Sequence, residues 1–465
     1  MIRSKPILTF VSLIALTLSY AHRDSTTVES LIKEGRDSSQ AKAILVELCE
    51  TVGPRTTGTP QCRAAEEWAL KKFKSFGVDS AWLEKWSETP QGFERGARQV
   101  GRMVSPSRKE FVFTTNNFTV GTYGPVRGRA VRHPETLGDI EVLKDVLKGA
   151  WVLMPAAVNM GGPGMRQRGA LDRALDDAGI AGRIYTTGGE LVWTSGRWND
   201  YTDETRPKTP MIAVRAEDYE SVVKAMEGGG PPQLEFDIEN KFIDEAIPFH
   251  NVVAEIRGVE KPDEAVILCA HLDSWNGPGS KGAQDNGTGV SVVLEAARIL
   301  AKSGAKPKRT IRFILWTGEE QGLLGSRAYV EAHRAEMAKV SAVLNEDSGG
   351  NYHSRMSGTA DMIEMLRAAA APMKDAFPGK PVEVVEIRQF SRGGGGSDHA
   401  SFIAADVPGF TFGKSGGISY RHSWHTQNDT PDLVPADHVA QMATNMAVIG
   451  YNLANAETLL PRLPR

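Results

Sequence analysis

The sequence has little cysteine and no apolar run long enough to span a membrane. Its 465 residues include three cysteines, which excludes a scaffold held together by many disulfides. Lysine plus arginine (54) and aspartate plus glutamate (57) nearly balance, so the formal charge is −3. Such a balance gives no basic surface for nucleic acid. We therefore expect a globular protein with neither a nucleic-acid partner nor a stable membrane association.

The N-terminus differs in character from the rest. Arg3 and Lys5 precede an apolar run from Ile7 to Leu18, which Ser19, Tyr20 and Ala21 follow. The run is shorter than the roughly 20 residues that cross a bilayer. A basic start, a short apolar stretch and small residues at −3 and −1, here Ser19 and Ala21, are typical of a secretory signal cut near Ala21. The prediction is a secreted or periplasmic protein.

The few cysteines leave one pairing open in an oxidising compartment. Cys49 and Cys62 flank a loop rich in glycine, proline and threonine, but spacing alone does not decide whether they form a disulfide. Cys269 lies in an apolar run and is expected to be a buried thiol.

The character of the chain changes twice along its length. Residues 26–78 carry apolar residues at helical spacing, 115–240 alternate short apolar stretches with glycine-rich turns, and from about 248 strands and helices alternate. The predicted boundaries are a signal over 1–21, a first part of the main domain over 22–115, a β-rich insertion over 116–243, and the rest over 244–465. The alternation predicts an α/β three-layer sandwich around a mixed, mainly parallel sheet.

Two histidines and three carboxylates follow predicted strands or turns in the last region. They are His271, Asp285, Glu320, Asp347 and His425. Residues at the carboxyl ends of parallel strands meet at one edge of the sheet, where such folds bind ligands. Imidazole and carboxylate together are ligands that suit Zn²⁺. Asp285 could equally be a helix N-cap, but the set as a whole predicts a centre of two metal ions.

Two further acids lie beside these ligands. Glu319 precedes Glu320, so one glutamate can bind metal while its neighbour accepts a proton from a bound water. Asp273 lies two residues after His271 and on the same side of the strand. Metal-bound imidazoles usually donate their second N–H to such a carboxylate. His422 competes with His425 for the last ligand position.

Six motifs in order make the chain resemble the M28 family of zinc exopeptidases, and within it the carboxypeptidase Q branch. They are AHLDS (270–274), QDNGTG (284–289), WTGEEQGLLGS (316–326), NEDSGG (345–350), SDHASF (397–402) and HTQNDTPD (425–432). The resemblance covers about 245–455, with weaker support from the residues around Arg55. It implies that 116–243 is similar to a protease-associated domain, inserted into the catalytic domain.

The resemblance also implies roles for single residues. One zinc would be held by His271, Asp285 and Asp347, and the other by Asp285, Glu320 and His425; the family context selects His425 over His422. Glu319 would be the general base and Asp273 would orient His271. A cis peptide is implied between Asp285 and Asn286. The segment Ser397, Asp398 and His399 is similar to one that lines the substrate pocket, and Tyr420 could donate its hydroxyl to the oxyanion.

The expected activity is hydrolysis of terminal peptide bonds of short peptides by a metal-bound hydroxide. The protein would be an aminopeptidase or a dipeptidase, with a carboxypeptidase as the alternative; Arg392 and Arg421 could bind a free carboxylate. A silent binding ectodomain and a single-zinc cyclase are the alternatives from other classes. Gly413–Gly417 matches the G-x-S-x-G string of serine hydrolases, but no helix is expected after it. A peptide is the expected partner, and the oligomeric state, including a homodimer, is open.

Overall fold

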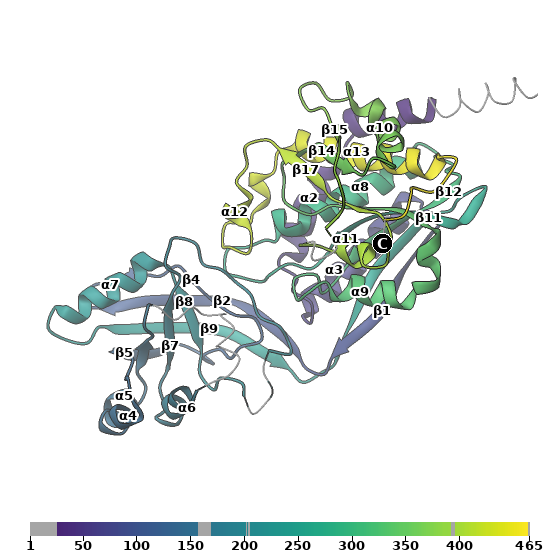
Figure 1. The fold of residues 1–465 in the computed structure, drawn as a ribbon. Coiled ribbons are helices and arrows are strands. Elements are labelled where there is room, and N and C mark those ends of the chain that lie inside the picture. The colour runs from purple at the N-terminus through teal and green to yellow at the C-terminus, as the bar shows by residue number, and fades with distance from the viewer. Residues whose placement is uncertain (1–25, 157–168, 201, 203–204, 392–395, 464–465) are drawn as a thin grey trace, which may run out of the picture.

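The computed structural model describes residues 26–156, 169–200, 202, 205–391 and 396–463 (Figure 1). The predicted signal segment and Arg392 lie outside these residues. Within the described ranges, none of the helices combines the length and the apolar character needed to cross a membrane.

The central sheet is mixed, with a parallel middle. In the described chain it has six strands in the order β1-β10-β12-β11-β13-β16. Their bounds are β1 Ser80–Thr89, β10 Ile247–Ile256, β11 Lys261–His271, β12 Arg309–Trp316, β13 Val340–Asn345 and β16 Gly409–Phe410. β11 pairs in parallel with β12 and β13, and β13 with β16, whereas β10 is antiparallel to β1 and β12. The predicted α/β class with a mixed sheet is confirmed.

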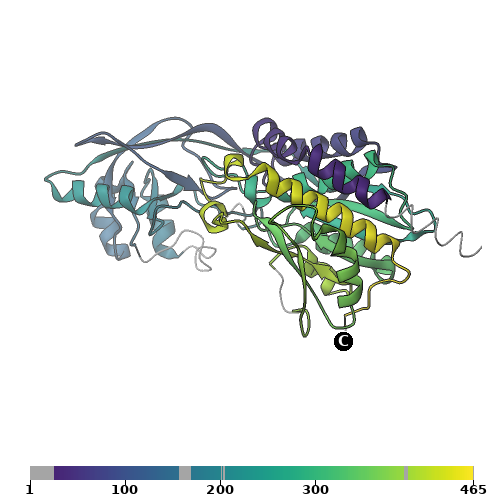
Figure 2. The same ribbon diagram turned by 90° about the horizontal axis from the view of Figure 1, so that it is seen from above.

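Helices cover both faces of this sheet because its buried side chains alternate between the faces. Leu268 and Leu344 point to one cluster, whereas their neighbours Cys269 and Val343 point to the other. The first face is covered by α2 Ala41–Glu47, α3 Pro60–Phe76, α8 Thr288–Lys302 and α13 Ala436–Asn455; the second by α9 Leu324–Ala332 and α11 His399–Ile403. Figure 2 shows α13 lying beside the N-terminal helices on the same side. The result is a three-layer sandwich.

Smaller elements border the sandwich. They are η1 Leu48–Val52, η3 Ala283–Gly287, η4 Arg334–Lys339, η5 Ala371–Met373, η6 Pro431–Leu433, α10 Ile363–Ala370, α12 Tyr420–Ser423, and a small sheet of β14 Tyr352–Gly358, β15 Glu383–Glu386 and β17 Phe412–Ser415.

A second, eight-stranded sheet forms a separate lobe in the described chain (Figure 1). Its strands are β2 Gly92–Ser105, β3 Lys109–Glu110, β4 Phe113–Thr115, β5 Val126–Arg132, β6 Trp151–Leu153, β7 Gly182–Thr186, β8 Met211–Val214 and β9 Gln233–Ile243; its helices are α4 Leu137–Val142, α5 Lys144–Leu147, α6 Ala170–Asp177 and α7 Ala216–Glu227. Phe236 packs against Phe113 and Trp151 in its core. The lobe begins at Gly92, earlier than the expected residue 116, because β2 pairs along β9.

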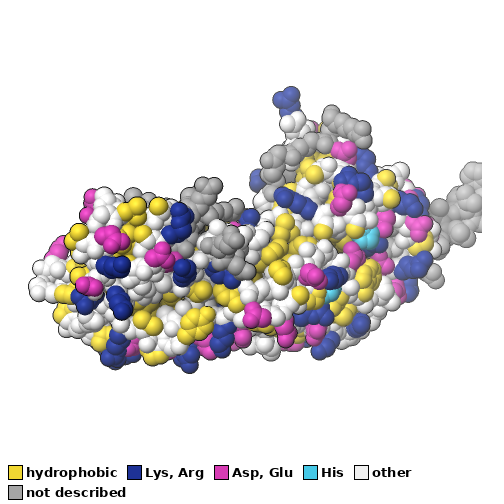
Figure 3. Space-filling view, turned by 90° about the horizontal axis from the view of Figure 1, so that it is seen from below, with side chains coloured by type: hydrophobic (Ala, Val, Ile, Leu, Met, Phe, Trp, Pro, Cys, Tyr) yellow, Lys and Arg dark blue, Asp and Glu magenta, His cyan; other side chains and the backbone are white. Residues whose placement is uncertain are grey.

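Charged side chains of both signs are mixed on one face of the molecule (Figure 3), and the three cysteines are buried. On the face in Figure 3, acidic and basic side chains are scattered without a region of one sign. Cys49, Cys62 and Cys269, all within the described chain, are buried free thiols, so the Cys49–Cys62 pairing is not formed. Cys62 Sγ instead lies 3.9 Å from Thr57 Oγ1.

Candidate metal centre

The five predicted ligands meet at the carboxyl edge of the parallel strands. His271 is the last residue of β11, Glu320 follows β12 and Asp347 follows β13. Asp285 lies in η3, directly before α8, and His425 follows α12. Three neighbouring strands therefore bring together residues that are far apart in the sequence, which is the usual position of a site in an open α/β sheet.

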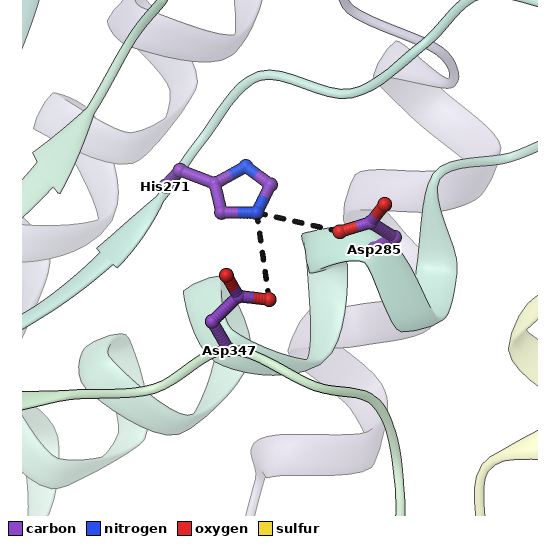
Figure 4. A group of neighbouring side chains, drawn as sticks. All are labelled: His271, Asp285 and Asp347. Atoms are coloured by element: carbon purple, nitrogen blue, oxygen red, sulfur yellow. Dashed lines mark ion pairs between the residues drawn. The ribbon is translucent and has the colours of Figure 1, made fainter. Parts of the chain in front are cut away.

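One group of ligand atoms is centred on His271 (Figure 4). Its Nε2 lies 3.4 Å from Asp285 Oδ1 and 3.7 Å from Asp347 Oδ1. Burial alone would lower the pKa of His271, but the charge of Glu319 and the neighbouring aspartates raise it well above its ordinary value. Without a metal this imidazole holds a proton between carboxylates, the place that a cation would otherwise take.

The second group lies on the other side of Asp285. His425 Nε2 is 3.2 Å from Asp285 Oδ2 and 3.0 Å from Glu320 Oε2. In each group one ligand atom from every residue lies within 4.8 Å of the others. Asp285 thus turns one oxygen toward each group, which is the arrangement that a carboxylate bridging two ions requires. The Asp285–Asn286 peptide is cis, as the resemblance implied.

The donor atoms suit resident metal ions. Among the described residues, the buried atoms His271 Nε2, Asp285 Oδ2 and Glu320 Oε1 make no hydrogen bond, although His271 Nε2 and Asp285 Oδ2 lie within ion-pair distance of a neighbouring side chain. A buried polar atom without a partner costs free energy unless something else satisfies it. Imidazole nitrogens with carboxylate oxygens are ligands of Zn²⁺ and similar divalent ions. The residues therefore fit the zinc ions that the motifs imply.

Glu319 belongs to neither group but lies beside the first. Its Oε2 is 4.0 Å from His271 Nε2, and its side chain lines the cavity above the ligands. Burial raises the pKa of Glu319 well above its ordinary value, and the nearby acids add to the effect of burial. A carboxyl group with a raised pKa beside the ligands is suited to receive and return a proton.

Asp273 contacts His271 and also supports the neighbouring turn. His271 Nδ1 lies 3.0 Å from the Asp273 backbone oxygen, whereas the carboxylate is 3.6 Å away. That carboxylate accepts hydrogen bonds from the backbone N–H groups of Gly318 and Glu319, at 3.0 and 3.3 Å, and from Thr57 Oγ1 at 3.0 Å. The Asp273 side chain thus also holds the turn that carries Glu319.

Two buried residues fix the loops around Asp285. The Arg55 guanidinium donates to the backbone oxygens of Leu272 and Gly282, at 2.5 and 2.9 Å. The Asp429 carboxylate accepts from the N–H groups of Gln284 and Asp285, at 2.6 and 3.2 Å. Burial raises the pKa of Asp429 to about 7. The string HTQNDTPD contains Asp429, so the sequence offered a signal for this residue.

The centre opens into a cavity of about 640 Å³. The predicted residues Ser397, His399 and Tyr420 line it, whereas Asp398 does not. Asp398 is buried, with both carboxylate oxygens lacking a hydrogen-bond partner. Burial raises the pKa of the Tyr420 hydroxyl well above its ordinary value, so the hydroxyl keeps its proton. Gly349 has φ +83°, and a Cβ there would lie 2.6 Å from the Tyr420 ring.

Other sequence candidates lie elsewhere. His422 and Arg421 are exposed and do not line the cavity. Ser415 of the G-x-S-x-G string is exposed and hydrogen-bonds Ser354, 3.0 Å away. The preceding Lys414 is an ion-pair partner of Glu346, so the string is part of a structural contact and not a nucleophile.

The inserted lobe reaches the centre through a segment that the sequence did not single out. The Thr194 N–H donates to the backbone oxygen of His425 at 2.9 Å, and Trp193 forms a β-bridge with Thr426. Gln427 extends this contact: its Oε1 accepts from Val192 N at 2.9 Å. Trp193 and Trp424 pack edge to face, with ring centres 5.4 Å apart. We call residues 190–197 the strap.

The sequence and the structure are both similar to those of known peptidases. Residues 251–449 match the family model described as Peptidase family M28. A peptidase M28 precursor from Shewanella amazonensis has a similar structure, with a TM-score of 0.66 and 26% identity over 96% of this chain and 99% of that one. The chain is a metallopeptidase, similar to the peptidases of family M28.

Its relatives match over both lobes. Carboxypeptidase Q of Bos taurus is 26% identical over 450 residues, which cover 94% of this chain and 90% of that protein. A zinc aminopeptidase from Bacillus subtilis shares the fold, with a TM-score of 0.57 and 20% identity over 89% of this chain and 94% of that one. The similarity to carboxypeptidase Q is the one that the six motifs indicated.

Proposed function

We propose that this metallopeptidase is a zinc exopeptidase with two ions per chain, which removes terminal residues from short peptides as an aminopeptidase or dipeptidase. The observation that carries the proposal is Asp285. Its two oxygens face two separate histidines, at 3.4 and 3.2 Å. A carboxylate that only capped α8 would have no reason to lie between two imidazoles.

Each side chain of the centre has a distinct task in the proposed reaction. His271, Asp285 and Asp347 would hold one ion, and Asp285, Glu320 and His425 the other. When bound, the ions supply an acidic water near neutral pH and a Lewis acid for the peptide carbonyl. Glu319 takes the proton of the attacking water and returns it to the leaving amine. The Tyr420 hydroxyl lines the same cavity and is available to the carbonyl oxygen.

Export completes the proposal. Arg3, Lys5 and the apolar run up to Leu18 support a cleaved signal, and these residues lie outside the described structure. A secreted or periplasmic peptidase would meet short peptides there.

The number of bound zinc ions and the hydrolysis of one dipeptide in three forms test the proposal together. Metal-free protein is titrated with Zn²⁺, and the loaded protein is given a Leu-Ala dipeptide in free, N-acetylated and C-amidated forms. We expect two bound ions and hydrolysis of the free dipeptide, with the N-acetylated form resistant. One ion would favour the cyclase, none the silent ectodomain, and cleavage of the N-acetylated form at an undiminished rate would favour the carboxypeptidase.

A further inference from the structure

One positively charged residue lines the cavity and has no role in the proposed reaction. Asp285, Glu319, Glu320 and Asp347 are accounted for by metal binding and proton transfer. Among the described residues that line the cavity, Arg197 is the one lysine or arginine, and it comes from the strap of the inserted lobe.

The Arg197 guanidinium has no hydrogen-bond or ion-pair partner among the described residues. Within the described chain no hydrogen bond or ion pair involves its side chain, although the side chain is partly buried. The buried guanidinium of Arg55 behaves differently, because it donates to the backbone oxygens of Leu272, Gly53 and Gly282. A half-buried cation facing a cavity without a partner is available to a ligand.

The backbone that carries Arg197 is fixed. Its N–H donates to Asp200 Oδ2 at 2.8 Å, and Asn117 N donates to the Ser195 oxygen at 2.8 Å. Gly196 has φ +119°, and a Cβ at that position would meet the Asn117 backbone at 2.5 Å. Only glycine allows this close approach, which turns the chain so that Arg197 reaches the cavity.

The strap also ties Arg197 to the centre itself. Thr194, which holds the backbone of His425, lies three residues before Arg197, so their Cα atoms are at most about 11 Å apart. One short segment thus sets the spacing between a metal ligand and the guanidinium. A dipeptide has its free carboxylate one residue beyond the cleaved bond, or about 4 Å along an extended chain.

We propose that Arg197 binds the C-terminal carboxylate of the substrate, and that the enzyme is therefore a dipeptidase. The inference rests on the proposed function. A guanidinium matches a carboxylate with two parallel hydrogen bonds, and it remains charged at any physiological pH. Of the two clamps suggested by the sequence, Arg421 is exposed and does not line the cavity, and Arg392 lies outside the described residues.

The test compares Leu-Ala with Leu-Ala amide in the zinc-loaded, full-length protein. The variants are Arg197→Met and Arg197→Lys, with Arg421→Met as a matched arginine outside the cavity. Wild type should prefer the free acid, and Arg197→Met should lower kcat/KM for it by about 10- to 100-fold, mostly through KM. Hydrolysis of the amide should not change, Arg197→Lys should retain part of the preference, and Arg421→Met should match wild type.

Two results would overturn the inference. The first is a wild type that does not distinguish acid from amide. The second is an Arg197→Met variant that loses activity equally on both peptides. Hydrolysis of neither peptide by zinc-loaded wild type would instead refute the proposed function, and this inference with it.

Discussion

At the scale of single residues, two adjacent glutamates illustrate how position separates roles. Glu320 lies 3.0 Å from His425 Nε2, and burial raises its pKa to about 7. Glu319 lies 4.0 Å from the other histidine and outside both ligand groups. The glycine at 318, with φ +75°, turns the chain directly after β12, so the two side chains leave the backbone in different directions.

Glu319→Gln should therefore separate catalysis from metal binding. Glutamine keeps the size of the side chain but cannot carry the proton, so kcat should fall by about 100- to 10,000-fold while two zinc ions remain bound. Turnover and metal content measured on the same sample check this. Glu320→Gln is the matched control, because it should lose one ion. Unchanged turnover of Glu319→Gln would remove it as the base.

A second buried glutamate, Glu346, precedes the ligand Asp347 and anchors its loop. Its carboxylate is paired with both Lys414 and His353, and Lys414 also donates to the Gly349 oxygen at 2.7 Å. Asn445 Nδ2 is 2.9 Å from His353 Nδ1. Burial would raise the pKa of Glu346, but Lys414 and His353 lower it to about 2.

Lys414→Met should destabilise the fold by about 3–5 kcal/mol, because it leaves a buried carboxylate without its cation. Urea unfolding at pH 7 measures the cost. Glu346 stabilises the fold fully above its ordinary pKa of 4.5, and this contribution is lost as the pH falls through about 2. Glu346→Gln combined with Lys414→Met should cost less than the sum of the two changes. A fully additive pair would contradict the interaction.

At the scale of elements, the inserted lobe is part of the metal centre through its strap. The His425 backbone adopts φ +59°, a conformation that is uncommon for residues other than glycine. Its backbone oxygen accepts from Thr194, and its ring lies between Trp424 and Trp275, at 4.2 and 6.0 Å between centres. The lobe therefore helps to hold one ligand in place.

Thr194→Pro should weaken one zinc site selectively. Proline removes the N–H that holds His425, and loss of such a supporting contact typically costs 10- to 100-fold in metal affinity. Thr194→Val keeps the N–H and is the control for loss of the hydroxyl, which lies 2.7 Å from Thr114 Oγ1. Zinc titration should show one weakened and one unchanged site. Equal weakening of both would point to a general disturbance of the fold.

At the scale of the whole molecule, metal and protons compete for the same buried imidazoles. In the metal-free protein burial would lower the pKa of His425, but Glu320 and Asp285 raise it to about 10. This histidine then stabilises the metal-free fold fully below its ordinary value of 6.5, and the contribution is lost as the pH rises through about 10. Zinc binding requires the neutral imidazole, so its pH dependence has the opposite sign.

The difference in Tm between zinc-loaded and metal-free protein should therefore grow as the pH rises from 5.5 to 8.5. Calorimetric scans of both forms measure it. Zinc binding should also release protons, which titration in two buffers of different ionisation enthalpy detects. A Tm difference that shrinks with rising pH would show that the imidazoles are not ligands.

The sequence by itself determined the layered α/β class of the main domain and the set of ligand residues at the metal centre. Apolar runs such as 265–270 indicate buried strands, and acids or histidines that follow neighbouring parallel strands meet at one edge of the sheet. These features depend on short stretches of sequence, so they can be predicted before the structure is known. The motif order added the assignment of His425 over the nearby His422.

Only the tertiary structure decided which residues support the centre. The strap, Arg197 and the Glu346–Lys414 pair join segments separated by many residues, and no local pattern marks them. The same reason explains why β12 lies between β10 and β11, and why the carboxylate of Asp273 serves the Glu319 turn. Contacts of this kind depend on how the two lobes and their loops pack, which periodicity and spacing along one chain do not encode.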